Sequence, residues 1–204
     1  MKRSLKYRQG LKEARRIVVK VGTRVLVQKS GRPDTRRILS LAKGIAALNR
    51  QGYEVAVVTS GAIGAGMEAL GMKDRPTALP QLQMAAAVGQ SRLMQAYEEA
   101  FDRRGRVVAQ VLLTHEDVQE RRRYLNAKHA LERLLEERAV PIINENDTVS
   151  VDEIKFGDND TLAGLVAGLV EAEALVVLSD VEGLFDSDPR RNHGPRSSLP
   201  SGGL

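Results

Sequence analysis

Short apolar runs alternate with longer amphipathic stretches along this chain of 204 residues. The short runs are rich in β-branched residues and apolar at nearly every position, which is typical of strands covered on both faces. They predict strands at 17–21, 55–59, 107–113, 140–143 and 175–178. Between these runs, apolar residues recur three and four positions apart, as they do on the buried face of a helix. This spacing predicts helices at about 38–48, 79–103, 124–138 and 162–169.

The alternation of strands and helices decides the expected fold class. It favours an α/β fold, a three-layer αβα sandwich with a mainly parallel central sheet. Ligands of such sheets bind at the carboxyl ends of the strands, so the residues after each apolar run are the candidate site. We expect a basic N-terminal extension at 1–15, the α/β domain at 16–190, and a disordered tail at 191–204 that is rich in Pro, Gly and Ser.

The composition narrows the class of protein. Hydrophobic residues make up 42% and charged residues 28% of the chain, which is ordinary for a soluble globular protein. No apolar run approaches the roughly 20 residues of a membrane-spanning helix, and the charged N-terminus does not resemble a secretory signal. The absence of cysteine excludes disulfides and fits a cytoplasmic protein. No metal site is expected, because the three histidines, His115, His129 and His193, have no paired spacing.

The net charge of +5 raises the question of nucleic-acid binding, so its location matters. Residues 1–16 hold seven Lys or Arg and one Glu, a net +6, and residues 190–204 hold three Arg and no acid, a net +3. Since the whole chain has a net charge of +5, the remaining residues 17–189 have a net charge of −4. Aromatic residues are only 3% of the chain, so the stacking platforms of a single-strand binder are missing. No nucleic-acid partner is expected, and the basic ends are interpreted as solvated tails.

Two predicted strands end in segments suited to phosphate or carboxylate. Lys20 precedes Gly22 at the end of the first strand, where an ammonium and a bare backbone could face phosphate oxygens. The alternative is a surface lysine before a turn. Ser60, Gly61 and Ala62 follow the second strand and open a helix, whose free N–H groups favour an anion. Close packing of helix on sheet also requires such small residues.

Polar clusters follow two later elements. Asn144, Glu145, Asn146 and Asp147 come directly after an apolar strand, and asparagine can donate and accept while a carboxylate can hold an ammonium. The segment 156–161 opens a helix with Asp158, Asn159 and Asp160, where a helix cap is the competing reading. Ser179 and Asp180 follow the last strand, where Asp180 could orient lysines or hold magnesium through water, and a turn aspartate is the competing reading.

Taken in order, these segments resemble the amino-acid-kinase domain of glutamate 5-kinases. The resemblance runs from about residue 17 to 190, and INEND followed by GDND is its most specific part. The matching motifs are VKVGT, VTSGAIGAG, AAVGQSRLMQ, VLLT, RYLNA, VPIINENDTV, EIKFGDNDTLA and LSDVEGLFDSDP. The resemblance implies an amino-acid-kinase-like fold and ATP-dependent phosphorylation of the L-glutamate side-chain carboxylate, the first step of proline biosynthesis.

The resemblance also implies a role for each matching residue. Lys20 would be catalytic by stabilising the transferring phosphoryl group, and Asp180 by organising the catalytic lysine arrangement. Substrate glutamate would be bound by Ser60, Gly61, Ala62, Asn144, Asp147 and Asn159. Lys20, Gly22, Ser179 and Asp180 would lie on the nucleotide side. The implied partners are L-glutamate, ATP with Mg²⁺, proline as a feedback inhibitor, and further copies of the chain in a homo-oligomer, with no membrane.

Two features depart from the family. Arg24 stands where many relatives have a small polar residue, which adds a cation beside the phosphate site. The kinase domain of the family continues beyond residue 204 with further strands and a glycine-rich nucleotide loop, so we expect a fold that is incomplete at the C-terminus. Three hypotheses follow: an active glutamate 5-kinase, a catalytically impaired fragment that keeps the fold and glutamate binding, and a nucleic-acid-binding module built on the basic ends.

Overall fold

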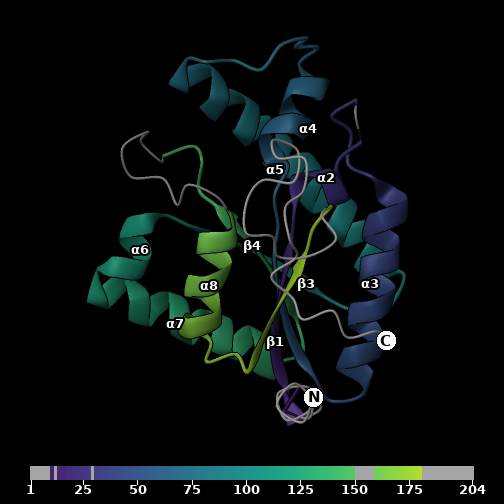
Figure 1. Cartoon of the computed structure of the whole chain (residues 1–204), viewed down its shortest axis with the longest axis vertical. Helices are drawn as coiled ribbons and strands as arrows, with labels where there is room; N and C mark the ends of the chain where they lie inside the picture. The colour runs from purple at the N-terminus through teal and green to yellow at the C-terminus, as the bar shows by residue number, and fades with distance from the viewer. Residues whose placement is uncertain (1–9, 12, 29, 150–158, 181–204) are drawn as a thin grey trace, which may run out of the picture.

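A computed structural model describes residues 10–11, 13–28, 30–149 and 159–180 (Figure 1). The strands run over β1 (Arg16–Val21), β2 (Glu54–Val58), β3 (Val108–Leu113), β4 (Val140–Glu145) and β5 (Ala174–Leu178). The helices run over α2 (Thr23–Leu26), α3 (Thr35–Arg50), α4 (Ala62–Ala69), α5 (Leu79–Asp102), α6 (His115–Gln119), α7 (Arg121–Glu136) and α8 (Asn159–Leu169). The tail expected at 191–204 and most of the N-terminal extension lie outside the described residues.

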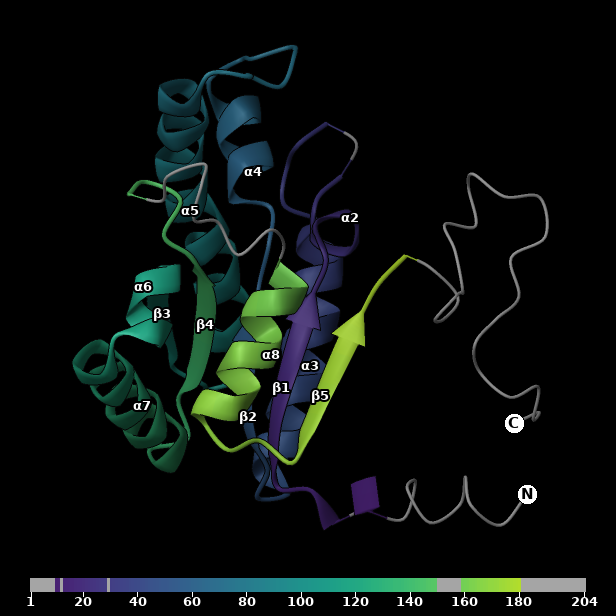
Figure 2. The same ribbon diagram turned by 60° about the vertical axis from the view of Figure 1, so that its left-hand side comes forward.

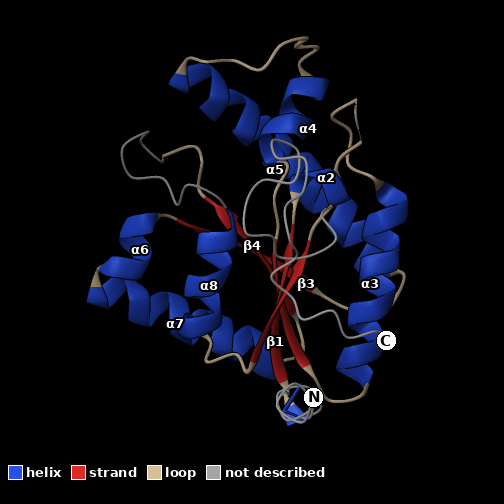
Figure 3. Ribbon diagram, in the orientation of Figure 1, coloured by secondary structure: helices blue, strands red, loops and turns tan. Residues whose placement is uncertain are grey.

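The five strands form one sheet in the order β3-β4-β2-β1-β5, in which every pair is parallel (Figure 3). Helices connect the strands, as parallel neighbours require, and cover both faces. The three-layer α/β prediction is therefore confirmed. All five predicted strands are present, and β4 is two residues longer than its apolar run because Asn144 and Glu145 still pair with β3.

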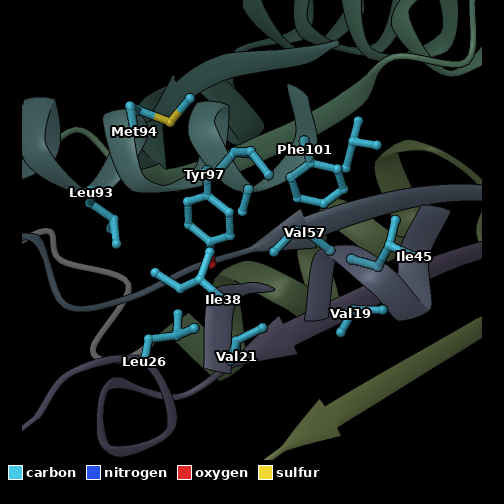
Figure 4. Packing of buried hydrophobic residues seen from close by; sticks show 14 of the residues in the cluster. Val19, Val21, Leu26, Ile38, Ile45, Val57, Leu93, Met94, Tyr97 and Phe101 are labelled. Atoms are coloured by element: carbon cyan, nitrogen blue, oxygen red, sulfur yellow. The ribbon is translucent and has the colours of Figure 1, made fainter. Parts of the chain in front are cut away.

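Alternation along the strands divides the core into two clusters, one on each face of the sheet. Val19 and Val57 point into the cluster formed with α3 and α5, where the rings of Tyr97 and Phe101 lie with their centroids 6.5 Å apart (Figure 4). Val18, Ala56 and Val58 point into the opposite cluster, which contains residues of α7 and α8. The period of two along a strand explains why apolar runs without polar interruption are needed here.

One expectation about the strands is wrong. The run at 175–178 predicted a strand covered on both faces, yet Leu175, Val176 and Val177 of β5 remain 40–49% exposed. In Figure 2, β5 lies at the edge of the sheet and pairs along one side with β1. The apolar side chains of a run indicate that burial is favourable, but the position of the strand in the sheet determines how much of each side chain is buried.

The predicted helices are confirmed, with ends shifted by a few residues. The start of α3 has a local cause, since the Asp34 side chain accepts hydrogen bonds from the N–H groups of Arg36 and Arg37. The short helices α2 and α6 were not predicted, because four or five residues do not show a helical period. Among the described residues, no helix has the length and apolarity to cross a membrane.

Helices α4 and α5 approach each other unusually closely. A Cβ atom added to Gly66 would lie 1.7 Å from the Ala85 carbonyl oxygen, and one added to Gly89 would lie 1.7 Å from the Ala62 carbonyl oxygen. Only glycine leaves room for this backbone contact. The contact holds the N-terminus of α4 at the end of β2, where the candidate site lies.

Candidate functional site

A cavity of about 380 Å³ opens at the carboxyl ends of β1, β2 and β4, which are neighbours in the sheet. Its lining comes from four separate segments, from the loop between α4 and α5, and from the first turn of α5. The lining residues are Lys20, Thr23, Ser60, Gly61, Ala62, Ile63, Gly64, Arg75, Leu82, Asn144, Glu145, Asp147, Asn159 and Asp160. Seven of the residues predicted to act in catalysis or substrate binding therefore share one cavity, as the parallel sheet requires.

Lys20 provides a cation at the sheet side of this cavity. It lies two residues beyond Val18 in β1 and so faces the layer that contains α8. Its side chain is only 11% exposed, and its Nζ lies 2.6 Å from Oδ1 of Asp160 in the first turn of α8. The half-exposed Asp160 carboxylate holds the ammonium in place at the cavity wall.

The N-terminus of α4 provides the second group suited to an anion. Gly61 precedes the helix with a φ of +103° and, as the N-cap residue, provides no side-chain cap hydrogen bond. A Cβ at Gly61 would lie 2.5 Å from Cγ2 of Val27, so glycine is required both by the backbone angle and by the space. The residues of this first turn line the cavity, and no side-chain acceptor from the described part of the chain bonds to their N–H groups, an arrangement that suits carboxylate or phosphate.

Three polar side chains form a connected wall of the cavity. Nδ2 of Asn159 donates to Oγ of Ser60 at 2.8 Å and to Oδ1 of Asn144 at 3.0 Å, and it also contacts the carbonyl oxygen of Thr59. Behind them, the Thr59 hydroxyl lies 2.9 Å from the Tyr97 hydroxyl in the core. Burial raises the pKa of Tyr97 strongly, so this phenol stays neutral and can share a proton with Thr59.

Charged groups of both signs face the cavity. Asp147 lies in the turn after β4, and Glu145 ends that strand. The exposed Arg75 lines the cavity from the loop between α4 and α5. The cavity can therefore receive a zwitterionic ligand with more than one carboxylate, because two cations and an uncapped helix N-terminus share it with carboxylates that attract an ammonium.

Of the four residues predicted for the nucleotide side, Lys20 lines this cavity, whereas Gly22, Ser179 and Asp180 do not. Gly22 follows β1, and its own N–H donates to the Leu178 carbonyl oxygen at 3.1 Å. Ser179 and Asp180 follow β5 and do not line the cavity. Asp180 pairs with Arg24 at 2.9 Å between exposed side chains, so the extra cation at position 24 already has a carboxylate partner.

Some residues of the site were not singled out by sequence reasoning. Asp160, which the sequence did not single out, pairs with Lys20 in the described part of the chain. Asp160 carried a signal, since it follows Asn159 in the same polar cluster. Thr23 also carried a signal, since it ends the VKVGT motif just after the first apolar run, whereas Arg75 follows no apolar run and carried none. Asp158, the other acid of that cluster, lies outside the described residues.

Comparison with known proteins agrees with this geometry. Residues 15–199 match the Amino acid kinase family. A protein named glutamate 5-kinase from Myxococcus xanthus is 63% identical over 187 residues, which are 92% of this chain and 49% of that protein. Similar proteins of the same name come from Nitrosococcus oceani, at 55% identity over 96% of this chain and 52% of the relative, and from Teredinibacter turnerae, at 52% identity over 91% and 50%. The chain spans about half the length of these relatives.

Proposed function

Since the chain belongs to the amino acid kinase family, we propose that it binds L-glutamate and transfers the γ-phosphoryl group of ATP to the glutamate side-chain carboxylate. The product would be L-glutamyl 5-phosphate, the first intermediate of proline biosynthesis. The observation that supports this most strongly is the shared cavity, which joins Lys20 and the α4 N-terminus to Asp147. The names of the relatives support the same reaction.

The charges of the cavity suit the three charged groups of glutamate. We place the side-chain carboxylate at the N-terminus of α4, near Ser60 and Lys20, and the ammonium near Asp147. Nδ2 of Asn159 is already engaged by Ser60 and Asn144, so Asn159 would meet the ammonium through its Oδ1. Arg75 is the remaining cation of the lining and would face the second carboxylate.

The proposed reaction needs no general base. A glutamate carboxylate is ionised at neutral pH, so its oxygen can attack the γ-phosphorus directly. A new O–P bond forms while the bond to the bridging oxygen of ADP breaks, and ADP leaves with that oxygen. The protein would then contribute mainly alignment and charge: Lys20 stabilises the phosphoryl oxygens, and the α4 N–H groups hold the nucleophile.

ATP and Mg²⁺ belong to the proposal rather than to the observed site. The described residues contain no group of three or more His, Cys, Asp or Glu that could hold a metal ion. Kinase Mg²⁺ is usually bound by one or two carboxylates together with nucleotide phosphates, and it neutralises phosphate charge. Asp160 and Asp180, which flank the ends of β1 and β5, are the carboxylates that could take part. Gly22 and Ser179 are proposed to lie on the same nucleotide side.

Glutamate binding and phosphoryl transfer are tested separately. Calorimetry should detect glutamate binding to the chain, and Asp147→Asn should weaken it by about 2–5 kcal/mol if this carboxylate holds the ammonium. The control is Asp102→Asn, the same change at the exposed end of α5, which should leave the affinity unaltered. Equal affinity in wild type and Asp147→Asn would contradict the placement of the ammonium.

Turnover separates the active kinase from a fragment that only binds. Glutamate-dependent release of ADP by the chain supports the kinase, and Lys20→Ala should abolish it while leaving glutamate affinity nearly unchanged. Glutamate binding without any ADP release would favour the alternative of a binding fragment. Homo-oligomerisation, inhibition by proline and a cytoplasmic location are further parts of the proposal. Light scattering and assays with added proline test the first two.

A further inference from the structure

A chain of buried hydrogen bonds leads from helix α5 to the wall of the cavity. Oε1 of Gln90 accepts from Nδ2 of Asn144 at 2.9 Å. Oδ1 of Asn144 accepts from the backbone N–H of Glu145 at 2.9 Å and from Nδ2 of Asn159 at 3.0 Å. Asn159 in turn donates to Ser60 at 2.8 Å. Gln90 and Asn144 are only 8% and 3% exposed, so water does not compete for these bonds.

The direction of this chain is determined by one backbone group. The N–H of Glu145 can only donate, so Asn144 must turn its oxygen toward Glu145 and its NH₂ group toward Gln90. Gln90 must then present its oxygen to Asn144. The Gln90 oxygen thereby stabilises the orientation in which Oδ1 of Asn144 accepts from Asn159, whose Nδ2 also donates to Ser60.

The other end of Gln90 faces a second, much smaller space. Nε2 of Gln90 is buried and has no hydrogen-bond partner among the described residues. Gln90 lines a cavity of about 20 Å³ together with the segment from Glu145 to Thr148, which contains Asp147. A space of this size accommodates one water molecule, which needs two to four polar partners. One water held here would join Nε2 to the turn that carries Asp147.

We propose that Gln90 is a positioning residue for the glutamate site. It does not line the larger cavity and so does not touch the substrate, but its carboxamide orients Asn144 and Asn159 and, through one buried water, supports the turn of Asp147. The identity of the ligand rests on the proposed function. The orientation of the two asparagines does not.

The test compares two replacements that differ in one property. Gln90→Glu keeps an oxygen that can accept from Asn144 in either protonation state, whereas Gln90→Met keeps the approximate volume and provides no comparable acceptor. The control is Gln95→Met on the exposed face of the same helix, where Gln95 bonds only to Glu99 among the described residues. Thermal unfolding verifies that each variant is folded.

Two measurements are made on each variant. Side-chain amide signals of Asn144 and Asn159, recorded by NMR without glutamate, should stay slow to exchange in wild type, Gln90→Glu and Gln95→Met, and exchange faster in Gln90→Met. Glutamate affinity should fall about 5- to 100-fold in Gln90→Met, the effect of one buried donor left without an acceptor. Gln90→Glu should stay much closer to wild type.

The outcomes distinguish positioning from simple packing. If Gln90 only fills space, Gln90→Met will match wild type and Gln90→Glu will be the damaged variant, which would overturn the proposal. If Gln90→Met does not fold, fast exchange of the two asparagine amides in wild type and Gln90→Glu would overturn it, and slow exchange in both would support it. A wild-type chain that does not bind glutamate contradicts the proposed function, while the amide signals still decide the role of Gln90.

Discussion

The contact between α4 and α5 makes a sharp prediction for Gly89→Ala. A Cβ at this position would lie 1.7 Å from the carbonyl oxygen of Ala62 and 2.4 Å from the backbone nitrogen of Gly66. Both obstacles are backbone atoms, so no side-chain rotation can relieve the overlap, and the helices would have to separate by more than an ångström to reach the ordinary contact of 3.4 Å. The substitution therefore tests the packing of the whole α4 helix.

The size of the effect follows from two opposing terms. Overpacking a well-packed interior costs typically about 1–3 kcal/mol, and backbone obstacles place this case at the upper end or beyond. Replacing glycine by alanine inside a helix contributes up to about 1 kcal/mol in the other direction. We therefore expect Gly89→Ala to lower the free energy of unfolding by about 2 kcal/mol or more.

Urea denaturation followed by circular dichroism measures this change. With a slope of about 2 kcal/mol per molar urea, the midpoint should fall by about 1 M. The matched control is Gly44→Ala in α3, where an added Cβ meets nothing within 4 Å and should raise stability by about 0.5–1 kcal/mol. If Gly89→Ala were as stable as wild type while Gly44→Ala behaved as expected, the inferred backbone contact between α4 and α5 would be wrong.

Three further predictions concern the site and its support. Tyr97→Phe should cost about 1 kcal/mol by removing a buried hydrogen bond. Because the folded pKa of Tyr97 is raised, wild-type stability should fall as pH rises above about 10, more steeply than that of Tyr97→Phe in urea titrations. Gly61→Ala should weaken glutamate binding measured by calorimetry, since Val27 and the positive φ both oppose a side chain. Asp160→Asn should remove the ion pair with Lys20 and reduce the rate of ADP release more than the affinity for glutamate. Equal losses in rate and affinity would argue against a role of Lys20 limited to the phosphoryl group.

Most of the architecture could be predicted because it depends on local regularities. Five apolar runs became five strands, and residues spaced three or four apart became α3, α5, α7 and α8. Parallel strands bring their carboxyl ends to one edge, so Lys20, Ser60, Asn144 and their neighbours could be assigned to one region before any coordinates were known. The short helices α2 and α6 were not predicted because four or five residues are too few to show a repeated helical spacing.

Contacts between side chains from distant segments could not be predicted from these local regularities. Lys20 pairs with Asp160 in the first turn of α8, whereas Asp180 pairs with Arg24. Nothing in the spacing of residues along the chain distinguishes these two acids. Gln90 was not singled out from the sequence, and only the packed structure shows its bond to Asn144.

The sequence alone thus determined which segments become strands and helices and which polar residues stand at the strand ends, because both follow from the period of the backbone. The tertiary structure decided which of those polar groups touch, and how far β5 is buried at the edge of the sheet. The physical reason is the distance along the chain over which each effect acts. Periodicity acts over a few residues, whereas a hydrogen bond or an ion pair depends on atoms brought within about 3 Å by the packing of the whole fold.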